Sequence, residues 1–164
     1  MKLSTAGLEL IKRSEGFRSY VYKDVAGIST IGFGHRVSTG ESFAEGVDEA
    51  QATILLSSDV LEAERTVCRL VRVALTQGQF DALVDFCFNL GAGRLTTSSL
   101  LRELNAGRYE TAGEQLLRWE FAGGVVNSGL KARRHAEFEL WTKGNAAGST
   151  MPQFVSQVSA PHQA

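Results

Sequence analysis

The sequence predicts an α+β protein that is mostly helical and carries one small antiparallel sheet near its N-terminus. Residues 1–144 contain no proline, and most of them show apolar side chains at helical spacing. Between residues 17 and 37 the pattern changes, because aromatic and β-branched residues typical of strands gather there around a turn at Gly27. We therefore expect a sheet-bearing lobe at about residues 12–50, a helical lobe at about residues 65–144, and a cleft between them.

Glycines and capping residues bound the first expected helices. A helix at residues 4–15 ends at Gly16 and is expected to pack on the helical lobe. Asp48, followed by Gln51 three residues later, is typical of a capping box, and we expect it to open one long helix that extends to Val67.

The clearest helical pattern begins at Thr76, with Gln79 in the capping-box position and apolar residues spaced by three and four up to Phe88. Gly91 and Gly93 are expected to end this helix. The remaining expected helices span residues 97–106, 109–119 and 128–141, with Gly123 and Gly124 between the last two.

Composition and charge exclude several functional classes. Lys and Arg number 17 and Asp and Glu number 18, so the net charge is −1 and a nucleic-acid partner is not expected. No apolar run approaches the roughly 18 residues that a membrane-spanning helix needs, so stable membrane insertion is not expected. Lys12, Arg13 and Glu15 are preceded by no apolar stretch, and we therefore expect neither a signal peptide nor a signal anchor.

Neither the cysteines nor the histidines suggest a metal or another cofactor. Cys68 and Cys87 fit neither a disulfide framework nor a metal site, and we expect both to be buried. The three histidines lack metal-ligand spacing, so we expect no metal and no other cofactor. The length favours a single domain, residues 1–144, and we expect the protein to be a monomer. Residues 145–164 contain both prolines and no charged side chain, and we expect a poorly ordered or loosely docked tail there.

Three residues in or just before the strand-like region could carry chemistry. A hairpin turning at Gly27 would set Asp24 opposite Thr30 or nearly so. Glu15 lies in the last turn of the first helix, where the helix dipole favours the protonated acid that a general acid requires. Two carboxyl groups in unequal environments, with a hydroxyl to hold a water, are the working parts of glycoside hydrolysis. Acid pairs at this spacing are common, however, and on spacing alone they are more often solvated surface charges.

The residues around this trio resemble the catalytic segment of the phage-type lysozymes, glycoside hydrolase family 24. The family pattern is a Glu, eight residues, an Asp or Cys, five residues, and a Thr followed by Ile-Gly-x-Gly-His. Glu15, Asp24, Thr30 and His35 occupy these positions at the same spacing. The similarity continues through residues 86–93 and covers about residues 4–143.

The resemblance implies a lysozyme-like fold and an activity. Glu15 is implied as the general acid, Asp24 as the carboxylate that stabilises the developing cation or guides water, and Thr30 as the residue that positions the water. The implied enzyme is an endolysin, a lysozyme that hydrolyses the β-1,4 bonds between N-acetylmuramic acid and N-acetylglucosamine in peptidoglycan. We expect inversion at the anomeric carbon. The alternative is a lytic transglycosylase, which would need the acid but no water site.

The resemblance also implies contacts around the site. The expected substrate contacts are His35, Arg36, Phe88, Asn89, Ser99 and Gln115. His35 could instead hold the hairpin by hydrogen bonding, and Arg36, which departs from the family pattern, could favour an anionic substrate or be solvated. One of Arg133 and Arg134 is expected to pair with Glu15, the alternative being an exposed helix face. A holin is expected as a functional rather than a physical partner, with the protein in the host cytoplasm until lysis and then at the cell wall.

Overall fold

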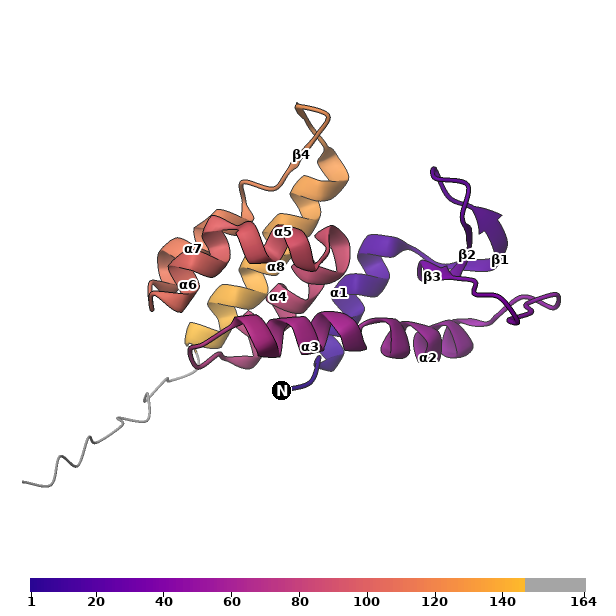
Figure 1. Cartoon of the computed structure of the whole chain (residues 1–164), viewed down its shortest axis with the longest axis horizontal. Helices are drawn as coiled ribbons and strands as arrows, with labels where there is room; N and C mark the ends of the chain where they lie inside the picture. Colours follow the sequence, from indigo (N-terminus) through magenta and orange to yellow (C-terminus); the bar gives the residue numbers. More distant parts are fainter. Residues whose placement is uncertain (147–164) are drawn as a thin grey trace, which may run out of the picture.

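Two lobes of unequal size make up the part of the chain that the computed structural model describes, residues 1–146 (Figure 1). In chain order the elements are α1 (Thr5–Glu15), β1 (Arg18–Lys23), β2 (Ser29–Gly32), β3 (His35–Arg36), α2 (Glu49–Asp59), α3 (Leu61–Leu70), α4 (Gln77–Leu90), α5 (Ala92–Thr97), α6 (Ser99–Asn105), α7 (Tyr109–Leu116), β4 (Phe121–Ala122), β5 (Val125–Val126) and α8 (Ser128–Ala146). The sheet β1–β3 and α2 form the smaller lobe, and α3–α8 form the larger one. The predicted fold class, α+β and mostly helical, is confirmed.

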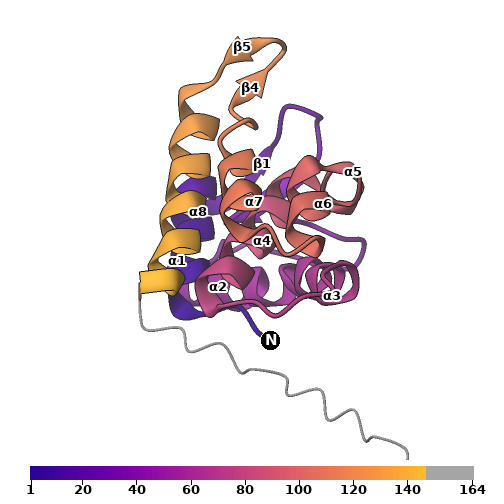
Figure 2. The same cartoon turned by 90° about the vertical axis from the view of Figure 1, so that its left-hand side faces the viewer.

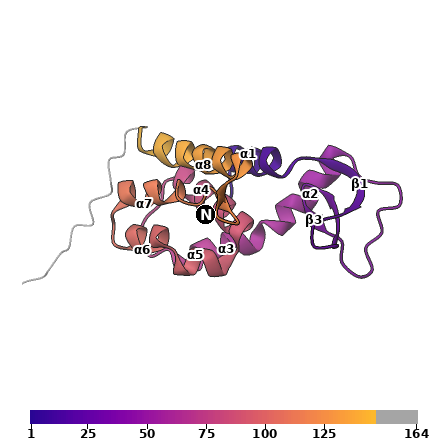
Figure 3. The same cartoon turned by 90° about the horizontal axis from the view of Figure 1, so that it is seen from above.

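Helix α1 belongs to the larger lobe although it precedes the sheet. It packs against α4 and α8 and stands beside α8 when the molecule is viewed from the side (Figure 2). Seen from above, the sheet-bearing lobe extends away from this bundle (Figure 3). The last residue of α1, Glu15, therefore lies where the two lobes meet. Gly16 follows it with φ 73°, a left-handed conformation that suits glycine at the end of a helix.

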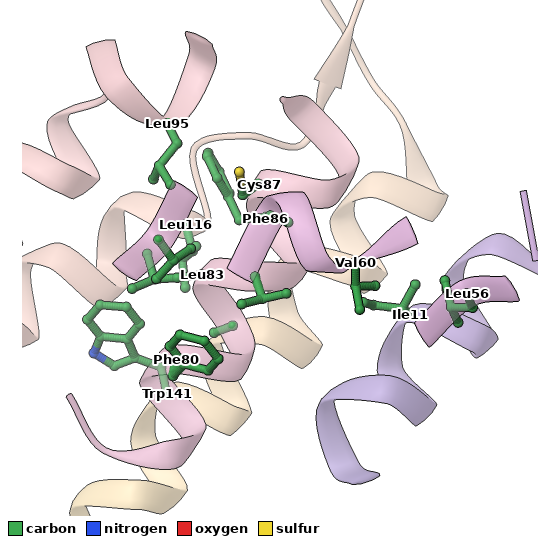
Figure 4. Close-up of a cluster of buried hydrophobic side chains, with 14 of the residues drawn as sticks. Ile11, Leu56, Val60, Phe80, Leu83, Phe86, Cys87, Leu95, Leu116 and Trp141 are labelled. Atoms are coloured by element: carbon green, nitrogen blue, oxygen red, sulfur yellow. The ribbon is translucent and has the colours of Figure 1, made fainter. Parts of the chain in front are cut away.

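The core of the larger lobe is built around α4, which contacts α1, α3, α5 and α8. Its buried side chains include Phe80, Leu83 and Phe86, each of which is at most 1% exposed. Trp141 of α8 packs beside Phe80 in the same cluster (Figure 4). Burying each such large apolar side chain contributes about 1.5–3 kcal/mol to folding, so α4 fixes the positions of its four neighbours.

The predicted capping boxes of α2 and α4 are both confirmed. The Asp48 carboxylate accepts a hydrogen bond from the Gln51 amide at 2.7 Å, and the Gln51 side chain accepts one from the Asp48 amide at 2.9 Å. Thr76 and Gln79 form the same reciprocal pair at the start of α4. These side chains satisfy backbone N–H groups that have no partner within the helix.

The register of the β1–β2 hairpin differs from the prediction. Thr30 pairs with Tyr22 and not with Asp24, because the turn is centred one residue earlier than Gly27. The Asp24 side chain causes this shift, since its Oδ1 accepts hydrogen bonds from the amides of Ala26 and Ile28, both at 2.8 Å. Asp24 therefore begins the turn instead of lying in the ladder opposite Thr30.

Several helix boundaries also differ from the prediction. The single long helix expected after Asp48 is two helices, α2 and α3, that meet at Val60. Val60 keeps helical backbone angles, φ −73° and ψ −14°, so the hydrophobic pattern runs through the junction without a stop signal. Gly93 does not end α4, because α5 starts directly after Gly91 and contains it. Cys68 is exposed, contrary to expectation, since it lies off the face of α3 that Ala63 and Val67 bury.

The Gly123–Gly124 pair does more than separate two helices. Both glycines have positive φ, 58° and 82°, and they join β4 to β5 in a hairpin that projects from the larger lobe (Figure 2). A Gly-Gly pair between Phe121 and Val125 is a recognised signal of a two-residue hairpin, so the sequence did contain this information.

The expected tail, residues 145–164, falls almost wholly outside the described residues, and only its first two residues are seen, at the end of α8. Within residues 1–146, none of the helices combines the length and the apolar character that crossing a bilayer requires.

Candidate active site

A cleft of about 550 Å³ lies between the two lobes. Both lobes line it, and so does the end of α1. The lining residues are Glu15, Tyr22, Asp24, Thr30, Gly34, His35, Arg36, Ser38, Asp59, Phe88 and Asn89. The structure thus brings to one cavity the three residues singled out for chemistry and four of the six expected substrate contacts.

Glu15 enters the cleft from the C-terminal end of α1, and its side chain is 26% exposed. Its Oε1 accepts a hydrogen bond at 2.8 Å from Nη1 of Arg133, so Arg133 is the arginine that pairs with it. Gly34 lies over the carboxyl group, and a Cβ built on it would be 3.7 Å from Oε2 of Glu15. Glycine here leaves the second oxygen of Glu15 open toward the cleft, and its φ of 90° requires glycine as well.

Arg133 is held by a second carboxylate from the core of the larger lobe. Its Nε and Nη2 donate to the two oxygens of Asp85 at 2.9 Å and 2.7 Å. The side chains of Arg133 and Asp85 are 6% and 0% exposed. This bidentate contact with the carboxylate fixes the plane of the guanidinium. It therefore also fixes the direction of the N–H group that donates to Glu15.

Arg134, the next residue, supports the other side of the cleft. Its Nη2 donates to Oδ1 of Asn89 at 2.6 Å and lies 3.2 Å from Oε1 of Glu137. Its guanidinium also stacks over the Phe86 ring, 5.1 Å from the ring centroid. Neither arginine lies on an exposed helix face, since Arg134 is fully buried and Arg133 nearly so.

Asp24 and Thr30 lie on the sheet side of the cleft. Oδ1 of Asp24 is occupied by its two backbone hydrogen bonds, and within residues 1–146 no protein group donates to Oδ2. Thr30 is 4% exposed, and its hydroxyl donates to the carbonyl of Ile28 at 3.1 Å. Because its proton is used in this way, the hydroxyl oxygen can accept a hydrogen bond from a water in the cleft.

His35 lies between two carboxylates. Its Nδ1 is 3.0 Å from both oxygens of Asp59, and its Nε2 is 3.1 Å from Glu41. Burial lowers the pKa of His35, but the hydrogen bonds with Asp59 and Glu41 outweigh it, and the pKa is raised above 6.5. His35 lines the cleft and also joins β3 to α2 and to the loop before it, so the expected hydrogen-bonding role is observed, and contact with the substrate stays a prediction.

This arrangement predicts a pH dependence of stability. Because folding raises the pKa of His35, its contribution is complete below the unfolded pKa of about 6.5 and is lost as the pH rises through the folded value. We expect His35→Gln to lower the melting temperature clearly at about pH 5.5 and much less at about pH 8.5. Melting curves of both proteins measure this, and an equal loss at the two pH values would contradict the ion pair.

The other predicted contacts divide into two groups. Arg36, Phe88 and Asn89 line the cleft. Ser99 and Gln115 are not among its lining residues, and instead the Ser99 hydroxyl donates to the Gln115 side chain at 2.8 Å, which ties α6 to α7. They hold two helices together at this point of the fold.

Several residues of the site were missed by reasoning from sequence. Tyr22, Ser38 and Asp59 line the cleft without standing in any recognised motif. Asp85 carried a usable signal, because it interrupts the apolar stretch of α4 with a charge that a buried helix face would otherwise exclude. Asp85 is fully buried, so this charged break in the apolar pattern of α4 corresponds to a buried ion pair.

Comparison with known proteins identifies relatives in both sequence and fold. The phage lysozyme family model matches residues 12–137. An endolysin of Bacillus phage B103 is 42% identical over 148 residues, which make up 89% of this chain and 56% of that protein. An endolysin of Salmonella phage P22 is 39% identical over 137 residues, 82% of this chain and 94% of the relative. The muramidase domain of SpmX from Asticaccaulis excentricus shares the fold with a TM-score of 0.78 at 39% identity, covering 85% of this chain and 97% of that domain.

The extent of these matches differs between relatives. The chain spans 56% of the length of the Bacillus phage B103 and PZA endolysins, but nearly all of the P22 protein. The family match covers most of the chain and includes the whole segment from Glu15 to His35. The chain belongs to the phage lysozyme family.

Proposed function

We propose that this protein is an endolysin that hydrolyses the β-1,4 bonds between N-acetylmuramic acid and N-acetylglucosamine in bacterial peptidoglycan. The observation that carries the proposal is the convergence of Glu15, Asp24 and Thr30 on one cleft between the lobes. The family membership and the endolysin names of its relatives support the same activity. Such a cleft suits a glycan strand, because an extended polymer can cross it and present one linkage to the carboxyl groups.

In the proposed reaction Glu15 donates a proton to the glycosidic oxygen as the bond to the anomeric carbon breaks. A water held by Thr30 and Asp24 attacks that carbon, and Asp24 takes up the proton that the water loses. The hydroxyl oxygen of Thr30 would accept one hydrogen bond from the water, and Oδ2 of Asp24 the other. The ionised Asp24 also stabilises the positive charge that develops on the sugar ring.

We expect inversion because the acid and the water-holding residues enter the cleft from different elements. An inverting hydrolase needs room for a water between its two carboxyl groups, with a separation of about 6.5–9.5 Å, against about 5–5.5 Å in a retaining enzyme. Attack from the face opposite the leaving group turns the β-linkage into an α-anomeric product.

Proton NMR of the products during early turnover, before mutarotation, tests this expectation. We expect the α-anomer of the muramic acid end to appear first. A β-anomer would mean that Asp24 acts as a nucleophile. An anhydro-muramic product without a reducing end would identify a transglycosylase and leave Thr30 without its proposed role.

Replacing Asp24 by Ala is expected to reduce hydrolysis strongly, because both the charge and the water-holding oxygen are lost. Asp24 also caps the hairpin turn, so folding must be checked separately. Asp24→Asn keeps Oδ1 for the turn and removes the base, and it should be impaired by about 10²-fold or more. Turbidity assays on permeabilised Gram-negative cells measure the effect. If Asp24→Asn clears these cells as fast as the parent does, Asp24 is a bystander.

We further propose that the protein acts as a monomer and resides in the host cytoplasm until lysis. A separate pore-forming protein, a holin, would then give it access to the cell wall at the end of the phage cycle. It would act as a functional partner without forming a stable complex.

A further inference from the structure

The surroundings of Glu15 raise a chemical difficulty for a general acid. A group that donates a proton must hold it at the working pH, yet Glu15 is paired with an arginine, which favours the ionised carboxylate. An arginine within about 4–6 Å ordinarily lowers the pKa of a carboxyl group by 1–3 units. Some other feature must therefore limit the effect of Arg133 on Glu15.

The contacts of Arg133 identify that feature. Two of its N–H groups donate to Asp85, at 2.9 Å and 2.7 Å, and a third donates to Glu15 at 2.8 Å. Asp85 is fully buried, whereas the Glu15 side chain is 26% exposed. Glu15 therefore faces an arginine whose charge a second carboxylate, held by two hydrogen bonds, already balances.

We propose that Asp85 is a positioning residue for the reaction: it neutralises and orients Arg133, so that Arg133 holds Glu15 in place without preventing it from keeping the proton that it donates. This inference rests on the proposed role of Glu15 as the general acid. Asp85 touches neither the cleft nor the substrate site and acts only through Arg133.

A third carboxyl group, Glu137, lies beside Asp85 in the same buried cluster. Within the described part of the chain neither oxygen of Glu137 receives a hydrogen bond, although both are buried and Arg134 lies 3.2 Å away. Burial and the neighbouring Asp85 carboxylate raise the pKa of Glu137 well above its ordinary value. A protonated Glu137 resolves the missing contacts, because it can donate a hydrogen bond to Asp85.

Other charged groups also face Glu15, and the test must leave them unchanged. On α8 this is Arg133, and across the cleft they are Asp24, His35, Arg36 and Asp59. Glu137 needs separate treatment, because it could ionise and take over the negative charge if Asp85 were neutralised.

The experiment compares the pH dependence of peptidoglycan hydrolysis in the parent, Asp85→Asn and the double variant Asp85→Asn/Glu137→Gln. Neutralising both groups leaves the charge of Arg133 unopposed. The alkaline limb of the profile, which reports loss of the proton from Glu15, should then move down by about one pH unit. Above that limb, activity should fall by about tenfold, and the single variant should lie between the parent and the double variant.

Asp81→Asn is the matched control. Asp81 lies one helical turn before Asp85 on α4 and is equally buried, but its oxygens bind Ser4 and Gln77. This variant should lose stability without moving the alkaline limb. If the double variant instead keeps the limb of the parent, Asp85 has only a structural role and the proposal is wrong.

A measurement on the parent protein needs no variant to fold. Carbon-13 NMR of labelled Asp and Glu side chains should show Asp85 ionised throughout the range in which Glu15 titrates. If Asp85 takes up a proton in that range, its charge cannot balance Arg133 and the proposal fails. The NMR measurement does not depend on catalysis, so it tests the coupling between Asp85 and Glu15 even if Glu15 is not the general acid. A Glu15→Gln variant that stays active would contradict the proposed function without affecting that test.

Discussion

Replacing Glu15 by Gln should reduce the rate of peptidoglycan hydrolysis by at least about 10²-fold while leaving the fold intact. Gln has nearly the same shape as Glu, but it has no acidic proton to give to the glycosidic oxygen. Its side-chain oxygen can still accept the hydrogen bond from Arg133, and Arg133 keeps both bonds to Asp85. We therefore expect the free energy of unfolding to change by no more than about 1 kcal/mol.

Hydrolysis of purified peptidoglycan and urea unfolding measure the two quantities. Glu9→Gln is a suitable control, because Glu9 lies on the same helix with a 51% exposed side chain and pairs only with Lys12. This control should hydrolyse peptidoglycan at the parent rate. If Glu15→Gln retains more than a tenth of the parent activity, Glu15 is not the general acid.

Replacing Trp141 by Ala should lower the free energy of unfolding by about 3–5 kcal/mol, the largest effect on stability that we expect from a single substitution. Trp141 is 1% exposed, and its indole N–H donates to the carbonyl of Tyr109 at 3.1 Å. It also packs directly on Gly113, where a Cβ would come within 2.8 Å of the indole ring. The truncation would therefore leave a cavity between α7 and α8 and remove the hydrogen bond to the Tyr109 carbonyl.

Trp141→Phe separates these two causes. It keeps an aromatic ring in the cluster but loses the hydrogen bond, so it should cost less than the Ala variant. Urea unfolding monitored by circular dichroism measures both variants, since α8 and its neighbours dominate the helical signal. A loss below about 1 kcal/mol for Trp141→Ala would mean that the α7–α8 contact contributes little to stability.

The site could be predicted from sequence where its residues are close along the chain. Glu15, Asp24 and Thr30 lie within sixteen consecutive residues, and a strand-like pattern with a fixed spacing links them. The register of the hairpin was missed, because the Asp24 side chain, and not Gly27, sets where the turn begins.

The groups that surround Glu15 could not be predicted in the same way. Arg133 is 118 residues from Glu15 and 48 residues from Asp85, so no local pattern connects them. Sequence reasoning left open which of two adjacent arginines would pair with Glu15. Only the packing of α1 and α4 against α8 decides this, by directing Arg133 toward the cleft end of α1 and Arg134 toward Asn89.

The placement of α1 makes the reaction sensitive to how the two lobes are oriented. The acid moves with the helical bundle, whereas the residues that would hold the water move with the sheet. Within residues 1–146 the chain passes between these two bodies twice, after Glu15 at Gly16 and between α2 and α3 at Val60. A small rotation about these two junctions would separate proton donor from nucleophile without altering a single side chain. A substitution that stiffens or loosens Gly16 or Val60 could therefore change the turnover rate as much as a change in the cleft itself.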